Sequence, residues 1–363
     1  MLRMIFATLI LASAVFSHSL RAQTGSADTA KLSEDSAITA FNRVAKRLQE
    51  ITKTPGAAIA IMHQGEFIHE LKLGFRDIDR QLPVTDETLF AIGSCTKAVT
   101  GVLAAQLVAE KKVEWESRAC DLNSDFKTSV DYVTEQATLK DIFTHQTGLA
   151  RHDILWFDAN FQPSDLLQKL PHLEFVFSFR KQFVYNNLMY SVGGLLLESA
   201  GKQSWNEMIR ERIFVPLGMA GSTTTYEEFI NNKNRSTGYE PDGITVVAHR
   251  NVDAVGPAGS IGSNLKDMKI WLEMLVKSGQ HEGQTFLQKE QFEFCTGPHV
   301  TTNHNDPSFY GIGWDVRWKN GMKVIGHGGG IDGQNCFVKF IPEAGFGIVV
   351  LANQQSDFDD LIV

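Results

Sequence analysis

The sequence predicts an α+β fold in which strands from both ends of the chain form one antiparallel sheet. Two observations support this prediction. Strand-like patterns occur at 56–75 and again at 322–353, while helical patterns and loops fill most of residues 94–290 between them. Strands and helices are thus segregated instead of alternating, which disfavours a series of βαβ units. We expect helices to flank the sheet, with a mostly helical lobe inserted between its two strand groups.

The strand patterns at the two ends mirror each other. After a polar helix predicted at 36–51, the stretch "GAAIAIMHQGEFIHELKLGF" indicates two strands joined at Gln64-Gly65. Near the other end, "MKVIGHGGG", "NCFVKFIPE" and "GFGIVVLAN" indicate three more strands, the last two joined by a turn at 342–345. The two strand groups would complete one sheet. The helices predicted between them lie at 94–111, 191–200, 204–213 and 265–277.

The N-terminus carries a predicted signal peptide, residues 1–22. An early arginine precedes an uncharged apolar run at 4–16, which is too short to span a bilayer, and small residues follow it. Cleavage is expected after Ser19 or Ala22. An uncleaved anchor and a mitochondrial presequence are the alternatives. The prediction implies a secreted or periplasmic protein without a stable membrane span after cleavage.

The remaining chain divides into a polar lead-in at 23–38 and one domain at 39–363. The chain of 363 residues is long enough for a large core, and 43% hydrophobic and 21% charged residues are ordinary for a soluble globular protein. The final stretch "SDFDDLIV" is typical of the start of a capped helix, so we expect a truncated C-terminal helix.

Charge and cysteine usage exclude some partners. Removing residues 1–22 removes two arginines and no acid, so the formal net charge changes from -8 to -10. An acidic chain without basic clusters is a poor candidate for binding nucleic acid, and we expect none to bind. The four cysteines are scattered without a Cys-x-x-Cys pair. Disulfides are possible in an exported protein, but the apolar surroundings favour free thiols.

A candidate nucleophile and base stand at the start of the helix predicted at 94–111. Ser-x-x-Lys occurs five times in the chain, but only Ser94 and Lys97 follow a glycine and open a long apolar helix. Residues three apart on a helix share a face, so Lys97 can reach the Ser94 hydroxyl. Desolvation beside an apolar helix lowers a lysine pKa, and the neutral amine can then accept the serine proton. A plain helix cap is the alternative role for Ser94.

Two further motifs supply the other groups that a serine hydrolase needs. Tyr185 and Asn187 form the chain's only Tyr-x-Asn, before an apolar helix. We expect a cation nearby to favour the phenolate of Tyr185, which would shuttle protons, and the Asn187 amide to bind substrate. His327 ends a predicted strand and begins a glycine run with Gly329 and Gly330, whose backbone can approach a bound acyl group. An aromatic core position and a helix cap are the alternatives for Tyr185 and Asn187.

In this order, at spacings of 91 and 142 residues, Ser-x-x-Lys, Tyr-x-Asn and His-x-Gly resemble the serine β-lactamase and penicillin-binding-protein superfamily. The similar branch holds class C β-lactamases, DD-peptidases and related esterases. Further similar stretches include "DIFTHQTGLARHD", "PLGMAGSTTT" and "YGIGWDV", and the likeness covers roughly residues 40–355. It implies a β-lactamase/transpeptidase-like fold, an acylated Ser94, and Lys97 as its base.

The resemblance also implies roles for the remaining groups. Tyr185 would pass protons, Asn187 would hold a substrate amide, and the backbone N–H groups of Ser94 and Gly330 would form the oxyanion hole. His327 stands where many members carry a lysine, so a permanent cation is replaced by a titratable group. This departure favours esterase or D-peptidase activity over β-lactam hydrolysis.

The expected substrate is a small-molecule or peptide-like ester or amide, and neither a cofactor nor a metal is expected. His145 and the His152-Asp153 pair could suggest a metal site, but no third ligand is spaced for zinc. Acyl transfer to an acceptor other than water stays open. The alternative from a different class is a non-catalytic or slowly deacylating member of the fold, acting as a penicillin-binding sensor or scaffold.

Overall fold

A computed structural model describes residues 27–156, 161–303 and 308–355 of the chain. The predicted signal peptide and the predicted truncated helix at 356–363 lie outside these ranges. The chain forms two compact units, one reaching to Ile51 and a second that begins at Thr52 and contains every candidate site residue.

The first unit contributes helix α2, Ala27–Thr52. The helix predicted at 36–51 therefore begins earlier, inside the stretch expected to be a polar lead-in. This early segment, "ADTAKLSED", contains alanine, lysine, leucine and glutamate, which have high helix propensity and extend a helix without apolar periodicity.

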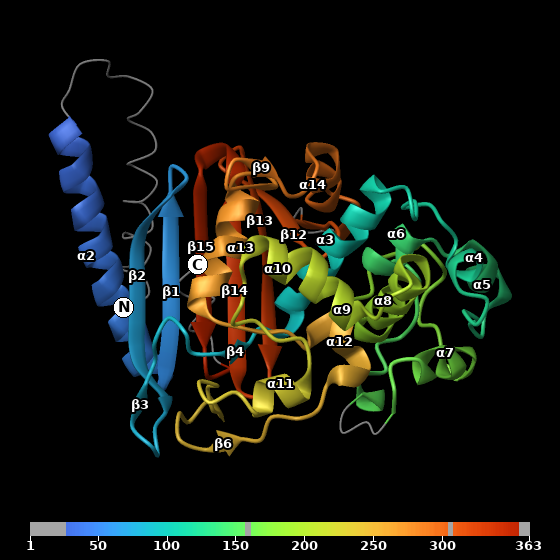
Figure 1. Cartoon of the computed structure of the whole chain (residues 1–363), viewed down its shortest axis with the longest axis horizontal. Coiled ribbons are helices and arrows are strands. Elements are labelled where there is room, and N and C mark those ends of the chain that lie inside the picture. The colour runs from blue at the N-terminus through green and yellow to red at the C-terminus, as the bar shows by residue number, and fades with distance from the viewer. Residues whose placement is uncertain (1–26, 157–160, 304–307, 356–363) are drawn as a thin grey trace. The chain divides into compact units, whose positions relative to one another are not determined.

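The second unit is built on an antiparallel sheet that joins both ends of the sequence (Figure 1). In the described part of the chain, the sheet has nine strands in the order β10-β11-β12-β13-β14-β15-β1-β2-β3. Strand β15 pairs with β1, with Val350 opposite Ile59 at its centre, so the predicted sheet is confirmed. The strands are β1 Gly56–His63, β2 Glu66–Asp77, β3 Leu82–Pro83, β10 Val300–Asn303, β11 Ser308–Tyr310, β12 Asp315–Lys319, β13 Met322–Ile331, β14 Gln334–Ile341 and β15 Phe346–Ala352.

The sequence patterns did not reveal strands β10, β11 and β12. Strands β10 and β11 have only four and three residues, too few to show a pattern, and the alternation in the five residues of β12 is brief. They extend the sheet because β12 pairs with β13 over five residue pairs, from Asp315 opposite Gly326 to Lys319 opposite Met322. Such pairing depends on the neighbouring strand more than on intrinsic preference. The described residues also form two-stranded pairs: β4 Phe90–Ala91 with β7 Gly262–Ser263, β5 Gly238–Tyr239 with β6 Val246–Val247, and β8 Gln280–His281 with β9 Gln284–Thr285.

Helices cover the sheet and form the lobe beside it, as predicted. Helix α13 lies across β15, β1 and β14, and the lobe gathers around α3 and α8 beyond β13 (Figure 1). The α-helices of this unit are α3 Thr96–Ala109, α4 Ala119–Leu122, α5 Asp131–Gln136, α6 Leu139–Phe143, α7 Asp165–Lys169, α8 Asn187–Gly201, α9 Trp205–Ile209, α10 Val215–Leu217, α11 Tyr226–Ile230, α12 Gly256–Gly259, α13 Leu265–Val276 and α14 Lys289–Cys295. Short 3-10 turns are η1 Gly93–Cys95, η2 Asp153–Leu155, η3 Leu170–His172, η5 Asp253–Val255 and η6 Pro342–Ala344, and η4 Arg210–Phe214 is a π-helical turn.

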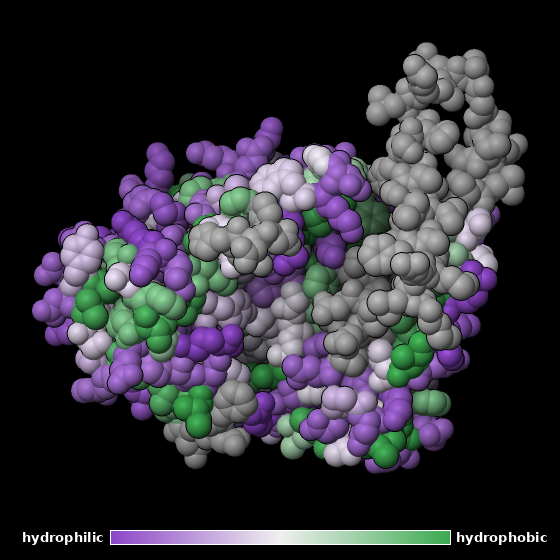
Figure 2. All heavy atoms as spheres, turned by 180° about the vertical axis from the view of Figure 1, so that it is seen from behind, coloured by the Kyte–Doolittle hydropathy of each residue, from purple (hydrophilic) through white to green (hydrophobic). Residues whose placement is uncertain are grey.

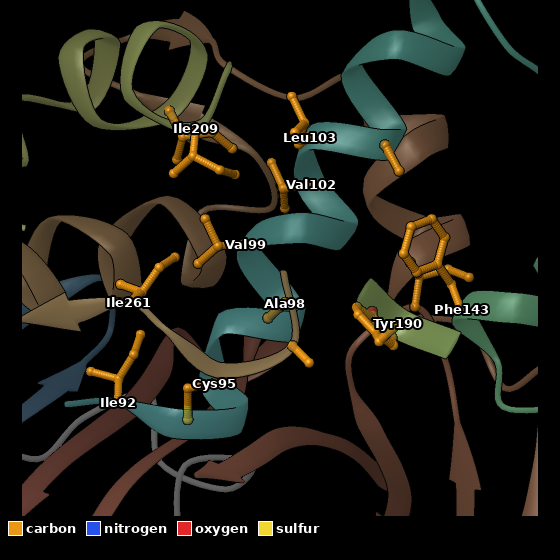
Figure 3. Close-up of a cluster of buried hydrophobic side chains, with 14 of the residues drawn as sticks. Ile92, Cys95, Ala98, Val99, Val102, Leu103, Phe143, Tyr190, Ile209 and Ile261 are labelled. Atoms are coloured by element: carbon orange, nitrogen blue, oxygen red, sulfur yellow. The ribbon is translucent and has the colours of Figure 1, made fainter. Parts of the chain in front are cut away.

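Helix α3 runs through the centre of the hydrophobic core. Its side chains contact apolar residues on opposite sides, with Ile209 and Ile261 on one side and Phe143 and Tyr190 on the other (Figure 3). A helix that is apolar all round is buried on all sides. The core therefore fixes the position of the Ser-x-x-Lys stretch at the start of this helix.

On the face shown in Figure 2, hydrophilic residues separate small groups of hydrophobic ones. None of the helices in the described ranges has the length and apolar character needed to cross a membrane. All four cysteines are free thiols, in agreement with the prediction, and Cys95, Cys295 and Cys336 are buried.

Candidate active site

Ser94 lies in the 3-10 turn η1, directly before α3. The N-cap residue of α3 is Cys95, and no side chain caps this helix end. The alternative role of Ser94 as a helix cap is therefore wrong. Gly93 has φ +49°, a left-handed conformation that favours glycine, and it turns the chain so that Ser94 begins the helical path.

Lys97 is fully buried and lies beside Ser94. Its Nζ is 3.1 Å from Ser94 Oγ, 2.7 Å from Asn187 Oδ1 and 2.9 Å from the carbonyl oxygen of Ala258. The side chain is 0% exposed, and Nζ also lies 4.7 Å from the centroid of the Tyr185 ring. Three elements, α3, α8 and α12, thus converge on one amine.

Burial gives this amine the properties of a base. Desolvation lowers the pKa of Lys97 well below its ordinary value, and the nearby Arg151 lowers it further. A neutral amine has two N–H groups and one lone pair. The Asn187 amide oxygen and the Ala258 carbonyl can only accept hydrogen bonds, so they take the two N–H groups. The lone pair is then left for the hydroxyl proton of Ser94.

Helix α8 presents Asn187 to Lys97 because its neighbour caps the helix. The N-cap is Asn186, whose Oδ1 accepts a hydrogen bond from the Met189 N–H at 3.0 Å. The alternative role of Asn187 as a cap is therefore wrong, and its amide is available. Asn187 Nδ2 donates to Asp153 Oδ1 at 3.2 Å, which fixes the amide with its oxygen toward Lys97.

Tyr185 lies beside Lys97 and interacts with the Ser94 side chain. Burial raises the pKa of Tyr185, although the interaction with Ser94 lowers it. The Arg151 cation lowers the pKa of Tyr185, as expected of a nearby positive charge, but burial outweighs this effect. Burial favours the neutral form of both Tyr185 and Lys97, so Tyr185 is held as a phenol that can relay a proton.

The glycine run of β13 lies against the turn that holds Ser94. A Cβ at Gly329 would lie 2.0 Å from the Ile92 carbonyl oxygen and 2.7 Å from the Ser94 nitrogen. A Cβ at Gly93 would lie 2.9 Å from the Gly330 nitrogen. Because these glycines have no side chain, the backbone of β13 can contact the backbone of the turn that holds Ser94. The N–H groups of Ser94 and Gly330 therefore lie near each other. This geometry suits an oxyanion hole.

His327 is bound by the protein at both ring nitrogens. Its Nδ1 donates to the Gly328 carbonyl at 2.6 Å, and its Nε2 lies 3.0 Å from the Tyr310 hydroxyl. Because Nδ1 carries the proton in the neutral ring, Nε2 accepts from the Tyr310 O–H. The side chain is 4% exposed. A direct contact between the imidazole and a substrate, expected from the sequence, stays a prediction and would require one of these bonds to break.

Two residues assist the site in ways that the motifs did not reveal. His145 Nδ1 accepts the Asn186 backbone N–H at 3.1 Å, and burial lowers the pKa of His145, which keeps it a neutral acceptor. Asp153 orients Asn187. Both lie in "DIFTHQTGLARHD", where the sequence suggested a family likeness and weighed a metal site but indicated neither of these roles, since a lone histidine or aspartate carries no spacing signal. In the part of the chain that the structure describes, no cluster of three His, Cys, Asp or Glu side chains could hold a metal ion.

Comparison with known proteins identifies relatives of the chain. The chain is similar to the unguisins hydrolase ungD' of Aspergillus campestris, with 29% identity over 86% of this chain and 61% of that protein. It is also similar to the protein flp of Staphylococcus aureus, with 24% identity over 84% of this chain and 60% of that protein. The chain thus spans about three-fifths of the length of the curated relatives it matches.

The fold is shared with a solved structure described as the octameric penicillin-binding protein homologue from Pyrococcus abyssi. The TM-score is 0.77 at 22% identity, covering 88% of this chain and 74% of that one. The family model named Beta-lactamase matches residues 41–362, nearly the whole of the predicted domain. The chain therefore belongs to the Beta-lactamase family.

Proposed function

We propose that this protein is a serine hydrolase that acts through a Ser94 acyl-enzyme on an ester, amide or peptide-like substrate. The observation that carries the proposal is the buried Lys97 amine, with two obligate acceptors for its N–H groups and Ser94 Oγ as its third neighbour. The relative named as a hydrolase supports the same reaction class.

The groups of the site suffice for a balanced acyl transfer. As Ser94 Oγ forms a bond to the substrate carbonyl carbon, its proton passes to Lys97 Nζ. The backbone N–H groups of Ser94 and Gly330 would bind the resulting oxyanion. A proton returns through the Tyr185 hydroxyl to the leaving group as the bond to it breaks. Water then attacks the acyl carbon, releases the acid and restores the Ser94 hydroxyl.

We further propose esterase or D-peptidase activity in preference to β-lactamase activity. Position 327 holds a histidine that is hydrogen-bonded to the buried Tyr310, where many members of the family carry a lysine with a permanent charge. We also propose that the protein is exported, on the strength of the apolar run at 4–16. Sequencing the N-terminus of the mature protein tests export, with Leu20 or Gln23 expected as its first residue.

A fluorophosphonate probe tests the acyl-enzyme. The wild-type protein should gain one adduct, located on Ser94 by mass spectrometry, and Ser94→Ala should gain none. Ser124→Ala, in another Ser-x-x-Lys stretch, is the matched control and should label like wild type. Absence of an adduct on Ser94 contradicts the proposal. With a chromogenic ester, a burst of product without steady turnover would instead indicate the slowly deacylating alternative.

A further inference from the structure

The site leaves open which residue could recognise a charged substrate. Lys97 is buried and favours its neutral form, and both nitrogens of His327 are bonded within the protein. Arg250 is a cation near the end of β13, but its backbone N–H and guanidinium all bind the buried Asp332. None of these three groups presents a free positive charge.

Arg151 differs from them in both contacts and exposure. Its guanidinium carbon lies 5.3 Å from the centroid of the Tyr185 ring, the same ring that Lys97 Nζ approaches at 4.7 Å. Its side chain is 53% exposed. Among the described residues, its hydrogen bonding is limited to Nε, which donates to Asp153 Oδ2 at 2.7 Å. The two terminal nitrogens of the guanidinium have no partner there.

The hydrogen bond to Asp153 fixes the position of Arg151 and leaves the two terminal nitrogens of its guanidinium available. The other oxygen of Asp153 accepts from Trp156 Nε1 at 3.0 Å and from Asn187 Nδ2 at 3.2 Å. The carboxylate is thus fixed by neighbours on both sides, and Arg151 is held beside Tyr185 and Asn187. A guanidinium anchored through Nε keeps its two outer N–H groups in the fork geometry that suits a carboxylate.

We propose that Arg151 is a specificity-determining residue that binds a carboxylate of the substrate, supplying from the loop before η2 the permanent positive charge that a lysine at position 327 would carry. The proposal rests on the proposed acyl-enzyme. It predicts that the enzyme prefers substrates with an anionic group a few atoms from the scissile carbonyl. The positive charge would come from Arg151, beside Tyr185 and Asp153, instead of from residue 327.

Matched ester pairs test this preference. The first pair is mono-4-nitrophenyl glutarate and 4-nitrophenyl pentanoate, which share a leaving group and a five-carbon acyl chain. The second is 3-carboxyphenyl pentanoate and its carboxamide, which carry the charge on the leaving half. Acylation is followed with enzyme in excess over ester, so turnover is not needed. The measured quantity is the second-order rate constant of acylation for the charged ester divided by that for its neutral partner. In wild type, the rate constant for the glutarate should exceed that for the pentanoate.

Arg151→Gln should lower this ratio about 10- to 100-fold in at least one pair, the range for a hydrogen bond to a charged group. Arg151→Lys should recover part of the ratio because it keeps the charge without the fork. Raising the salt concentration should lower the wild-type ratio, since the half-exposed guanidinium is screened. Arg118→Gln removes another arginine that pairs with a nearby aspartate, Asp121, and should leave the ratio unchanged.

A ratio unaffected by Arg151→Gln in both pairs overturns the proposal. That result would mean that Arg151 acts only by positioning Asp153 and Asn187. Its removal would then lower the acylation rate constants of charged and neutral esters by the same factor. If the ratio is unaffected but the fluorophosphonate still forms an adduct on Ser94, the proposed acyl-enzyme stands and only the proposed role of Arg151 fails. If no ester and no fluorophosphonate modifies Ser94, the proposed function fails and the role of Arg151 fails with it.

Discussion

Substituting Gly329 by alanine should separate catalysis from folding, because Gly329 is where β13 meets the turn that holds Ser94. The added Cβ would lie 2.0 Å from the Ile92 carbonyl oxygen, 2.7 Å from the Ser94 nitrogen and 2.8 Å from the Cys95 nitrogen. All three atoms belong to the backbone, so no side chain can rotate away. The matched control is Gly328→Ala, whose Cβ would meet only the Phe337 ring, at 3.3 and 3.4 Å.

The size of the effect follows from these distances. Real Cβ atoms essentially never approach closer than 3.0 Å, so the 2.0 Å contact requires the strand and the turn to separate by about 1.0 Å. A displacement of about 1 Å in a catalytic constellation can lower the rate about 100-fold, equivalent to about 2.7 kcal/mol of transition-state stabilisation. Overpacking should also lower the free energy of unfolding by about 1–3 kcal/mol.

The assay compares acylation of Ser94 by 4-nitrophenyl pentanoate in the two variants and in wild type. Circular dichroism and chemical denaturation verify that each variant is folded at the assay temperature. Gly328→Ala should acylate within a few-fold of wild type, while folded Gly329→Ala should be about 100-fold slower. Equal acylation by the two alanine variants would refute the reasoning, because the close backbone approach would then contribute nothing to the chemistry.

Three further outcomes are expected. The lowered pKa of Lys97 means that the unfolded chain binds more protons, so the free energy of unfolding should rise with pH from the folded-state pKa to about 10.4. Urea denaturation between about pH 7 and about pH 10 should show this slope, and an equal slope in Lys97→Met would contradict its origin. His327→Phe should lower the free energy of unfolding by about 2 kcal/mol, since the buried Tyr310 hydroxyl and the Gly328 carbonyl lose their partner; unchanged denaturation would count against this pairing. Iodoacetamide should modify Cys120 first in the native protein and the three buried cysteines only after denaturation, and mass spectrometry that found simultaneous labelling would disagree with their burial.

Much of the fold could be predicted because its strongest signals are local. The hairpin at Gln64-Gly65 and the strands at 322–353 carry turn residues between apolar runs, and the structure has them within a few residues. Strand β12 was missed although it alternates polar and apolar residues and Asn320-Gly321, a hairpin turn, joins it to β13. Strands β10 and β11 are too short to carry such a pattern, and they form because the neighbouring strand offers an edge for pairing.

The sequence by itself determined which residue types the site contains and in what order, through three motifs whose members lie close in the chain. The tertiary structure decided what those residues do. Lys97 becomes a base because α8 and α12 enclose it, Asn187 is available because Asn186 caps the helix, and both nitrogens of His327 are bound through Gly328 and Tyr310. The physical reason is that desolvation and hydrogen-bond satisfaction depend on every group packed around an atom, and those groups come from distant parts of the chain.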